Sequence, residues 1–349
     1  MDVTAQLIGT YRLPGGGTLV DGFHALGPGG ARRLLLRRGH DLEVHDLAGL
    51  LAGERAPDAV FPVPWPGWNH GVHAVAPDAG FAVFSGQRAV RAVDADGRTL
   101  WEHRHDCWGP LLGHPHTGDD QQVCDGLEHG SVHVSADGRL VWAHVVGDDG
   151  ERGRTESWRV LDARDGREID RIPLDDSVAA GSHQLPLSDG IHVALSVGMG
   201  QDGCLLYWAR REDGASVVRD LNEGLDRILL DVHPDRGRLL TVEHYGTDLQ
   251  LHGLDGTLLA EAVPTGPGPD RWDWYAGFAD ADTVIGSTGH DYGDDDPVRH
   301  WLLDGHLTPL GPVVYPAPVT GYARGLGDGT WLTHDRESDT LSRWTRAGS

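Results

Sequence analysis

The feature that most constrains the fold is a short hairpin pattern that recurs along the chain. It is clearest in residues 131–146, where apolar and polar residues alternate on both sides of a Ser-Ala-Asp-Gly turn. Alternation with a period of two places Val132 and Val134 on one face of a strand. The Asp137-Gly138 pair suits the positive φ angles of a tight turn. The segment therefore predicts two antiparallel strands joined by a short turn.

Related turns occur seven times, at intervals of 46 to 59 residues. They are centred near residues 28, 78, 137, 189, 235, 281 and 328. Each turn is followed by an apolar run, and most units contain a second turn, as at Asp96-Gly97 and Asp255-Gly256. Four short strands in about 50 residues, repeated in this way, are typical of a β-propeller. We therefore predict an all-β, seven-bladed propeller with four-stranded antiparallel blades.

Two segments carry a resemblance to a known superfamily. Residues 248–253 and 339–344 each begin with Asp and continue into an apolar strand, which is similar to the third-strand element of WD-repeat propellers. The Gly-His and Trp-Asp marks of a WD repeat are mostly missing. The resemblance to the WD-repeat-like propellers, related bacterial ones included, covers nearly the whole chain and implies the fold alone.

The two ends of the chain predict how the ring closes. Residues 5–13 form a lone strand with no turn before it, and the seventh unit ends after three strands, near residues 341–344. We expect the first strand to complete the last blade within a single domain of residues 1–349. The expected blades are 21–65, 70–105, 106–174, 180–221, 226–264, 272–313, and 320–349 together with 5–13. A short helical turn is expected within residues 47–55.

The net charge of −24 argues against nucleic acid and anionic membranes as partners, because both are bound largely through Lys and Arg. All 29 basic residues are arginine, which excludes Schiff-base, P-loop and Ser-Lys chemistry. The sequence contains no signal-peptide pattern and no apolar run of the ~18 residues that span a bilayer. It contains only three cysteines. These features favour a cytoplasmic protein without a disulfide framework.

The longest departure from the repeat, residues 102–130, raises the question of a divalent metal. Cys107, His114, His116 and Cys124 offer the sulfur and nitrogen atoms that zinc takes tetrahedrally. Their spacing matches no zinc-finger or ribbon pattern, so a polar loop without metal is favoured over a zinc site. The acidic loop 290–296 similarly offers carboxylates to Ca²⁺, but it lacks the order of an EF-hand, which favours a solvated loop.

A second set of candidates concerns ligand binding at one end of the ring, which we call the top. The top of the ring contains the connections between the second and third strands of each blade and the connections from one blade to the next. Aromatic residues concentrate in these connections. The predicted ligand-binding residues are His70, Trp68, Trp272, Trp274, Tyr275, Tyr322 and Arg227. For Trp68, packing of the loop against the rim is the alternative.

The histidines fall into two groups. His40, His244, His290 and His334 recur at comparable places in four blades, about 10 Å apart by strand geometry, and we predict structural roles for them. The inner-strand residues His24, His73 and His183, with His70 beside them, are the candidates for a central catalytic site. The negative net charge is expected to raise their pKa unless burial or a metal opposes it. Alternatively, each histidine separately bonds a backbone carbonyl.

Two functions remain open at this point. The favoured one is a module that binds a small ligand, peptide or protein partner on its top face through aromatic and histidine side chains. The alternative is a lyase or hydrolase at the axial mouth, using histidine acid–base chemistry or a divalent metal such as zinc or calcium. The fold itself does not decide between them.

Overall fold

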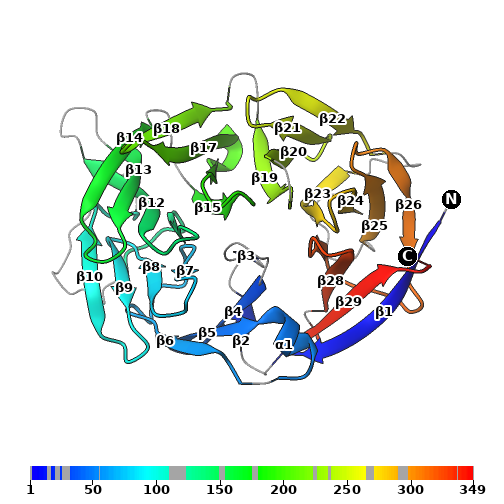
Figure 1. The fold of residues 1–349 in the computed structure, drawn as a ribbon, viewed down its shortest axis with the longest axis horizontal. Helices are drawn as coiled ribbons and strands as arrows, with labels where there is room; N and C mark the ends of the chain where they lie inside the picture. Colours follow the sequence, from blue (N-terminus) through cyan, green and yellow to red (C-terminus); the bar gives the residue numbers. More distant parts are fainter. Residues whose placement is uncertain are drawn as a thin grey trace.

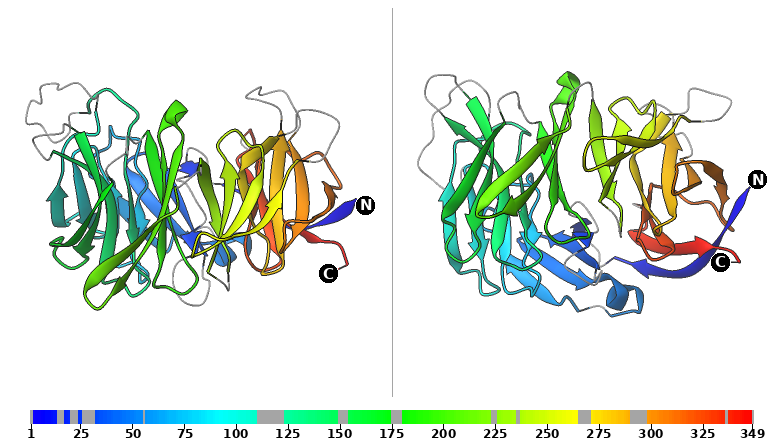
Figure 2. Two further views of the ribbon diagram at one scale, coloured as in Figure 1. Left: turned by 90° about the horizontal axis from the view of Figure 1, so that it is seen from above. Right: turned by 45° about the horizontal axis from the view of Figure 1, so that its top comes forward.

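The computed structural model describes residues 2–13, 17–19, 24–25, 32–54, 56–109, 123–148, 154–174, 180–222, 226–234, 237–264, 271–289, 298–335 and 337–348. Its strands form seven antiparallel blades arranged around a central axis (Figure 1), and hydrogen bonds join two of these blades, six and seven, into one eight-stranded sheet. Seen edge-on, the sheets stand side by side in a broad disc (Figure 2). The predicted seven-bladed β-propeller is confirmed.

The blades follow one another in chain order. Blade one contains β2 (Gly17–Leu19), β3 (His24–Ala25), β4 (Arg32–Arg38), β5 (Asp41–Asp46) and β6 (Ala59–Pro62); blade two contains β7 (Ala74–Val75), β8 (Ala82–Ser85), β9 (Ala89–Val93) and β10 (Thr99–Arg104); blade three contains β11 (Ser131–Val134), β12 (Leu140–Asp148), β13 (Arg154–Asp162) and β14 (Glu168–Leu174). Blade four contains β15 (Gly181–Pro186), β16 (Val193–Gly198), β17 (Cys204–Glu212) and β18 (Ala215–Asp220); blade five contains β19 (Arg227–Val232), β20 (Arg238–Glu243), β21 (Leu249–Gly253) and β22 (Leu258–Ala262). Blade six contains β23 (Arg271–Phe278), β24 (Thr283–Gly289), β25 (Arg299–Asp304) and β26 (Pro309–Val314); blade seven contains β27 (Ala323–Gly325), β28 (Thr330–Asp335), β29 (Thr340–Arg346) and β1 (Val3–Arg12).

The hairpin of residues 131–146 forms as its sequence predicts. Val132 pairs with Ala143 and Val134 with Val141 across β11 and β12. Gly138 takes a φ of +70°. The Asp137 carboxylate accepts hydrogen bonds from the Ser135 hydroxyl at 2.6 Å and from the Arg139 amide at 3.0 Å, which fixes the turn.

Strand β1 closes the ring. It pairs antiparallel with β29, from Ala5 opposite Arg346 to Arg12 opposite Thr340. Its first residues also pair in parallel with β26, where Val3 lies opposite Val313. The predicted pairing of the first strand with the last blade is therefore confirmed, and β1 additionally links blade six to blade seven. Both chain ends lie beside these two blades (Figure 1).

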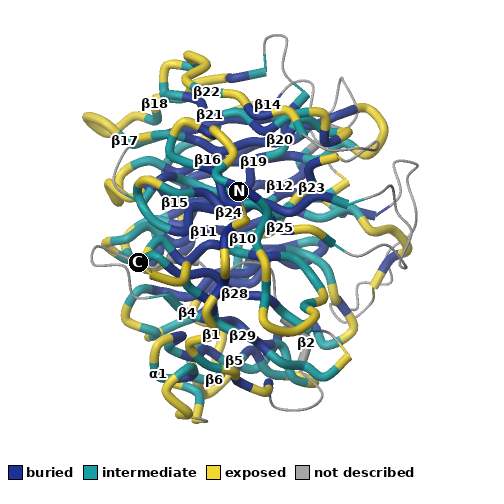
Figure 3. Tube along the Cα trace, turned by 90° about the vertical axis from the view of Figure 1, so that its right-hand side faces the viewer, coloured by how far each residue is buried: buried dark blue, intermediate teal, exposed yellow. Residues whose placement is uncertain are grey.

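The core lies between neighbouring blades, where the middles of the strands are buried and the connections are exposed (Figure 3). Tryptophans help to join adjacent blades. The indole of Trp101 in β10 donates to the carbonyl of Ala163, past the end of β13, at 2.7 Å, and Trp208 in β17 donates to Leu254, past the end of β21, also at 2.7 Å. Because each contact crosses from one blade to the next, these hydrogen bonds help to fix how adjacent blades pack against each other.

Among the described residues, two short helices interrupt the strands. Helix α1 (Leu47–Leu51) lies within the predicted segment 47–55, and Asp46 caps it by accepting from the Gly49 amide at 2.7 Å. The 3₁₀ turn η1 (Gly200–Asp202) lies in the connection between β16 and β17. Within the described part of the chain, neither helix has the length and apolar character needed to cross a bilayer.

Candidate functional site

A cavity of about 740 Å³ lies at the centre of the ring. We call it the axial cavity. Its wall combines side chains of the inner strands with residues of two top connections, Gly200 and Gln201 between β16 and β17 and His244 and Tyr245 between β20 and β21. Strand residues in the wall include His183, Leu185, Ser196, Ile228, Leu230 and Arg324. The cavity therefore lies at the end of the ring where the sequence predicts ligand binding.

Aromatic side chains gather on one side of this cavity. Trp274 and Tyr275 of β23 and Tyr245 of the β20–β21 connection all line it. Trp274 is 43% exposed and Tyr245 is 57% exposed, so both present accessible ring surface. The indole of Trp274 donates to the carbonyl of His244 at 3.1 Å. This hydrogen bond ties the aromatic rim of blade six to blade five.

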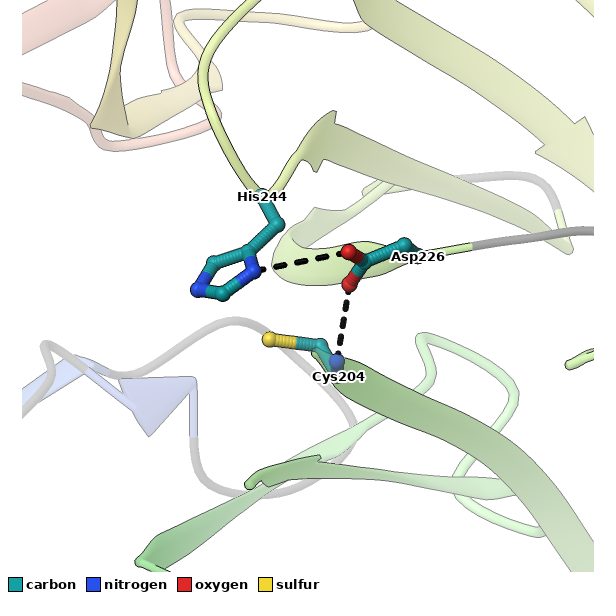
Figure 4. Close-up of side chains that lie close together, drawn as sticks. All are labelled: Cys204, Asp226 and His244. Carbon is teal, nitrogen blue, oxygen red and sulfur yellow. Dashed lines mark hydrogen bonds and ion pairs between the residues drawn. The ribbon is translucent and has the colours of Figure 1, made fainter. Parts of the chain in front are cut away.

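The side chains of Cys204, Asp226 and His244 lie close together (Figure 4), and the first and last of these residues line the same cavity. Cys204 begins β17, Asp226 immediately precedes β19, and His244 immediately follows β20. All three positions belong to top connections of blades four and five. One potential ligand atom from each residue lies within 4.8 Å of the others. Among the described residues, no other group of three or more such side chains comes this close.

Hydrogen bonds hold the backbone of the cluster in place. The Asp226 carboxylate accepts from the Cys204 amide at 2.8 Å, and the His244 amide donates to the Asp226 carbonyl at 3.0 Å. Glu243 fixes the turn after His244 by accepting from the Tyr245 amide at 2.9 Å. Gly203 has a φ of +106°, and a Cβ there would lie 2.9 Å from Asp226 Oδ1, so glycine allows the carboxylate its close approach.

The charges around Cys204 differ from those around a reactive cysteine. Burial, together with the nearby carboxylates of Asp226 and Glu243, raises the pKa of the Cys204 thiol to about 12. His244 Nδ1 lies 3.4 Å from an Asp226 carboxylate oxygen. It is buried, and no group in the described ranges makes a hydrogen bond of good geometry with it. The site thus contains a protonated thiol and a buried imidazole nitrogen beside a carboxylate.

Of the four inner histidine candidates, the three whose side chains are described, His70, His73 and His183, each make separate contacts. His183 lines the axial cavity, and its Nε2 donates to the carbonyl of Leu229 in the next blade at 2.8 Å. His70 instead stacks against His129, with ring centroids 5.9 Å apart. His24 lies in β3, and its side chain is outside the described part of the structure.

His73 differs most from its predicted catalytic role. It is 5% exposed, packs against Phe84, and its Nδ1 accepts from the Ser85 amide at 3.3 Å. Burial, followed by the charges of Arg37 and His129, lowers its pKa to about 3. The expected increase in pKa from the net charge is therefore overcome by desolvation. A neutral histidine inside blade two is a core residue rather than an acid or base at the cavity.

Three predicted ligand-binding residues are also core residues. Trp68 is 2% exposed and donates to the carbonyl of Ser85 at 3.1 Å, while Trp272 is 4% exposed and donates to the carbonyl of Ala262 at 2.8 Å. Arg227 is buried and pairs with Asp248 at 2.6 Å. Their burial does not agree with a ligand-facing role. Of the same set, Trp274 and Tyr275 line the cavity, and Tyr322 stacks on Tyr275.

Only some of the candidate zinc ligands in the long segment 102–130 lie within the described residues. The Cys107 thiol interacts with Cys124, and burial raises its pKa to about 11. Neither cysteine forms a disulfide in the described part of the chain. His114 and His116 lie outside the described residues, as do residues 290–296 of the predicted acidic loop. The predicted zinc and calcium alternatives for these two segments therefore remain predictions.

Sequence reasoning missed the cluster of Cys204, Asp226 and His244. It placed His244 among the structural histidines, because equivalent positions on adjacent blades are too far apart to share an ion. That distance argument does not apply here, since the three residues occupy different connections of two blades. The available signal was the presence of Cys, Asp and His in top connections that adjoin in a propeller.

Comparisons with known proteins agree with the fold. No protein-family model and no curated protein matches the sequence. Among solved structures, the chain is similar to the β-propeller domain of Cps50 (Swd1) from Myceliophteria thermophila, with a TM-score of 0.57 and 12% identity over 98% of this chain and 99% of that one. A chain of the mitotic checkpoint complex matches with a TM-score of 0.56 and 11% identity over 97% of this chain and 91% of that one.

A structure from a study of two prolyl endopeptidases matches with a TM-score of 0.54 and 16% identity, over 93% of this chain and 45% of that one. At sequence identities this low, the similarity shows a shared fold and does not indicate a shared function. The predicted resemblance to WD-repeat-like propellers is thus confirmed at the level of the fold.

Proposed function

We propose that the chain is a ligand-binding propeller whose axial cavity holds a small molecule or a peptide segment of a protein partner. The main observation that supports this proposal is the axial cavity. Its volume of about 740 Å³ falls within the range of small-molecule pockets, roughly 300–1,000 Å³. Its wall is mainly apolar, with a few polar groups that can orient a ligand, which is the usual composition of such pockets.

The side chains of the wall indicate the chemistry of the ligand. Trp274, Tyr275 and Tyr245 offer aromatic surface to a planar or apolar body. Arg324 brings a guanidinium group to the wall, which favours a ligand with a carboxylate, sulfonate or carbonyl oxygen. Because the chain carries a net charge of −24, this preference acts at short range rather than by steering from a distance.

Protein partners are consistent with this use of the fold. One of the similar propellers was solved as part of the mitotic checkpoint complex. A propeller of this shape can therefore serve as a scaffold within a protein assembly. For the present chain, the exposed rings of Trp274 and Tyr245 make the top face the part of the surface that we propose contacts a partner.

The test uses 1-anilinonaphthalene-8-sulfonate, a fluorescent probe with an apolar body and one sulfonate. Titration of the full chain should give saturable fluorescence, and Trp274→Ala or Tyr275→Ala should weaken binding about tenfold or more. Ile191→Ala is the control, because Ile191 is also an exposed hydrophobic residue but lies in the turn between β15 and β16, at the opposite end of its blade. Fluorescence that does not saturate, or that the two cavity variants leave unchanged, would count against the proposal.

A second candidate is a lyase or hydrolase that works at the axial mouth. The observation that favours it is the meeting of Cys204, Asp226 and His244 beside the cavity. Compounds or peptides that displace the fluorescent probe can be incubated with the chain and recovered for mass spectrometry. Recovery of the unchanged compound supports binding, whereas a cleaved or eliminated product supports the enzyme.

A further inference from the structure

The cluster of Cys204, Asp226 and His244 combines three kinds of donor atom. A thiolate, an imidazole nitrogen and a carboxylate oxygen are each ligands of zinc, and sulfur with nitrogen favours zinc-class ions over calcium or magnesium. Calcium would require six to eight oxygen ligands. The donor set therefore selects a borderline-soft divalent ion rather than a hard one.

The spacing of these side chains suits one small ion. Bonds of about 2.0–2.3 Å in a tetrahedral site place neighbouring ligand atoms about 3.3–3.8 Å apart. The ligand atoms of the cluster already lie within 4.8 Å of one another, and His244 Nδ1 is 3.4 Å from Asp226 Oδ2. The separations of the ligand atoms therefore exceed those around a bound ion by at most about 1–1.5 Å.

His244 supplies a second, independent observation. Its Nδ1 atom is buried, and nothing in the described segments forms a hydrogen bond with it. Leaving a buried polar atom unsatisfied costs about 1–3 kcal/mol. A metal ion bonded to this nitrogen would remove that cost and would use the neutral form of the ring.

The backbone around the cluster is already fixed. The carboxylate of Asp226 is held by the Cys204 amide, and the carbonyl of His244 accepts from Trp274. Ligands held in this way lose little conformational freedom on binding an ion. The arrangement also joins the connections of blades four and five, so an ion here would stabilise the contact between these blades.

The main alternative is a cysteine nucleophile activated by His244 and Asp226. Such a cysteine needs an electropositive surrounding that favours the thiolate. Cys204 instead faces the carboxylates of Asp226 and Glu243. Carboxylates disfavour a free thiolate, but a divalent cation placed between them and the sulfur reverses this effect.

We propose that Cys204, Asp226 and His244 bind one zinc-class divalent ion at the edge of the axial cavity. Cys204 and His244 both line the cavity, so the fourth coordination position of the ion would face the space where a ligand binds. Three protein ligands and one open position are the pattern of zinc sites that bind a water molecule or a substrate. The site does not depend on the ligand-binding proposal above, and the fluorescent-probe titration tests that proposal separately.

The test uses cobalt(II) and zinc with the full chain after treatment with a chelator. Cobalt should produce the strong visible absorption of a tetrahedral site and the near-ultraviolet charge-transfer band of a cobalt–thiolate bond. Zinc should displace the cobalt at one ion per chain and raise the melting temperature. Cys204→Ser should abolish the charge-transfer band. His244→Gln should weaken binding by at least about 100-fold, the upper end of what even the loss of an outer-shell partner costs.

Two matched controls address the other thiols and histidines of the chain. Cys107→Ser removes a thiol of the separate Cys107–Cys124 pair, and His192→Gln removes a histidine that lies 2.5 Å from Asp189 at the turn between β15 and β16. Both should bind cobalt as the unsubstituted chain does. A charge-transfer band that persists in Cys204→Ser, or that disappears in Cys107→Ser, would overturn the proposal, and so would the absence of the band in the unsubstituted chain. If Cys204→Ser does not fold, the cobalt affinities of His244→Gln and Asp226→Asn test the proposal instead. Both should bind cobalt more weakly than the unsubstituted chain, and unchanged affinity in both would overturn the proposal.

Discussion

Tyr275 and Tyr322 stack face to face beside the axial cavity, with ring centroids 4.2 Å apart and planes inclined by 9°. Tyr275 belongs to β23 in blade six and lines the cavity, whereas Tyr322 lies just before β27 in blade seven. An aromatic pair of this kind contributes about 0.5–1.5 kcal/mol beyond the burial of its surface. The stack therefore links two blades and limits the motion of a ring that we propose contacts the ligand.

Substitution of Tyr322 tests this link. Tyr322→Ala should lower the free energy of unfolding by about 1–2 kcal/mol and should weaken binding of the anilinonaphthalene probe, because Tyr275 loses its support. Tyr322→Phe keeps the stacked ring and should retain both properties. Urea unfolding and the probe titration measure the two effects. Equal losses in Tyr322→Phe and Tyr322→Ala would show that the hydroxyl, not the stack, is important.

Removal of β1 should open the ring. Deletion of residues 2–12 exposes the edges of β29 and β26 and removes the buried side chains of Val3, Ala5 and Tyr11. Each large buried apolar side chain contributes roughly 1.5–3 kcal/mol, and exposed strand edges promote aggregation. We expect a lower melting temperature and aggregates in size-exclusion chromatography. As a control, Leu7→Ser changes an exposed residue of the same strand and should have little effect. Unchanged melting of the deletion variant would contradict the closure.

Buried histidines should make the fold sensitive to acid. Burial lowers the pKa of His73 from 6.5 to about 3 and that of His300 to about 4. Between pH 6.5 and 4 the unfolded chain therefore binds protons at these positions that the folded chain does not. The free energy of unfolding should fall as the pH falls through this range, by up to about 1.4 kcal/mol per pH unit for each group.

Urea unfolding at pH 7, 6, 5 and 4 measures this slope. His300→Gln removes one titrating group, while its amide can still donate to the carbonyl of Gly321 that His300 contacts at 3.0 Å. This variant should be less stable at pH 7 but should lose less stability on acidification. The same slope in both proteins would show that His300 is not one of the groups responsible.

The fold was predictable because the turns repeat. Asp-Gly turns such as Asp137-Gly138 determine where a strand ends, and their interval specifies four strands per blade. The isolated strand at residues 5–13 predicted the closure because a propeller must pair its strand edges. These features depend on local sequence, so no knowledge of the packing between blades was needed.

Burial of individual side chains was harder to predict. Trp272 and Trp274 are two residues apart in one strand and should share a face, yet the first is buried and the second is exposed. The reason is an irregularity between Trp272 and Ala276, where the register of β23 against β24 shifts. Such a shift cannot be recognised from the alternation of apolar and polar residues.

The cluster of Cys204, Asp226 and His244 was beyond prediction for a different reason. Its members lie about 20 residues apart in three separate connections. Whether they meet depends on the rotation of blade five against blade four, which the packing between the blades sets. The sequence pattern singled out His244 but neither Cys204 nor Asp226, and only the packed structure brings the three side chains together.

Gly203 offers a test of how the cluster is held. Its φ of +106° strains any other residue, and the Cβ of Gly203→Ala would lie 2.9 Å from Asp226 Oδ1. The carboxylate should be displaced, and the affinity for zinc should fall about tenfold or more, as for the loss of an outer-shell partner. Gly200→Ala is the control from the same connection, because it also has a positive φ but meets no atom within 4 Å. Both variants should lose about 1 kcal/mol or more of stability, whereas Gly203→Ala alone should bind zinc weakly in competition with a chelator. Equal zinc affinities in the two variants would mean that the position of Asp226 does not govern binding.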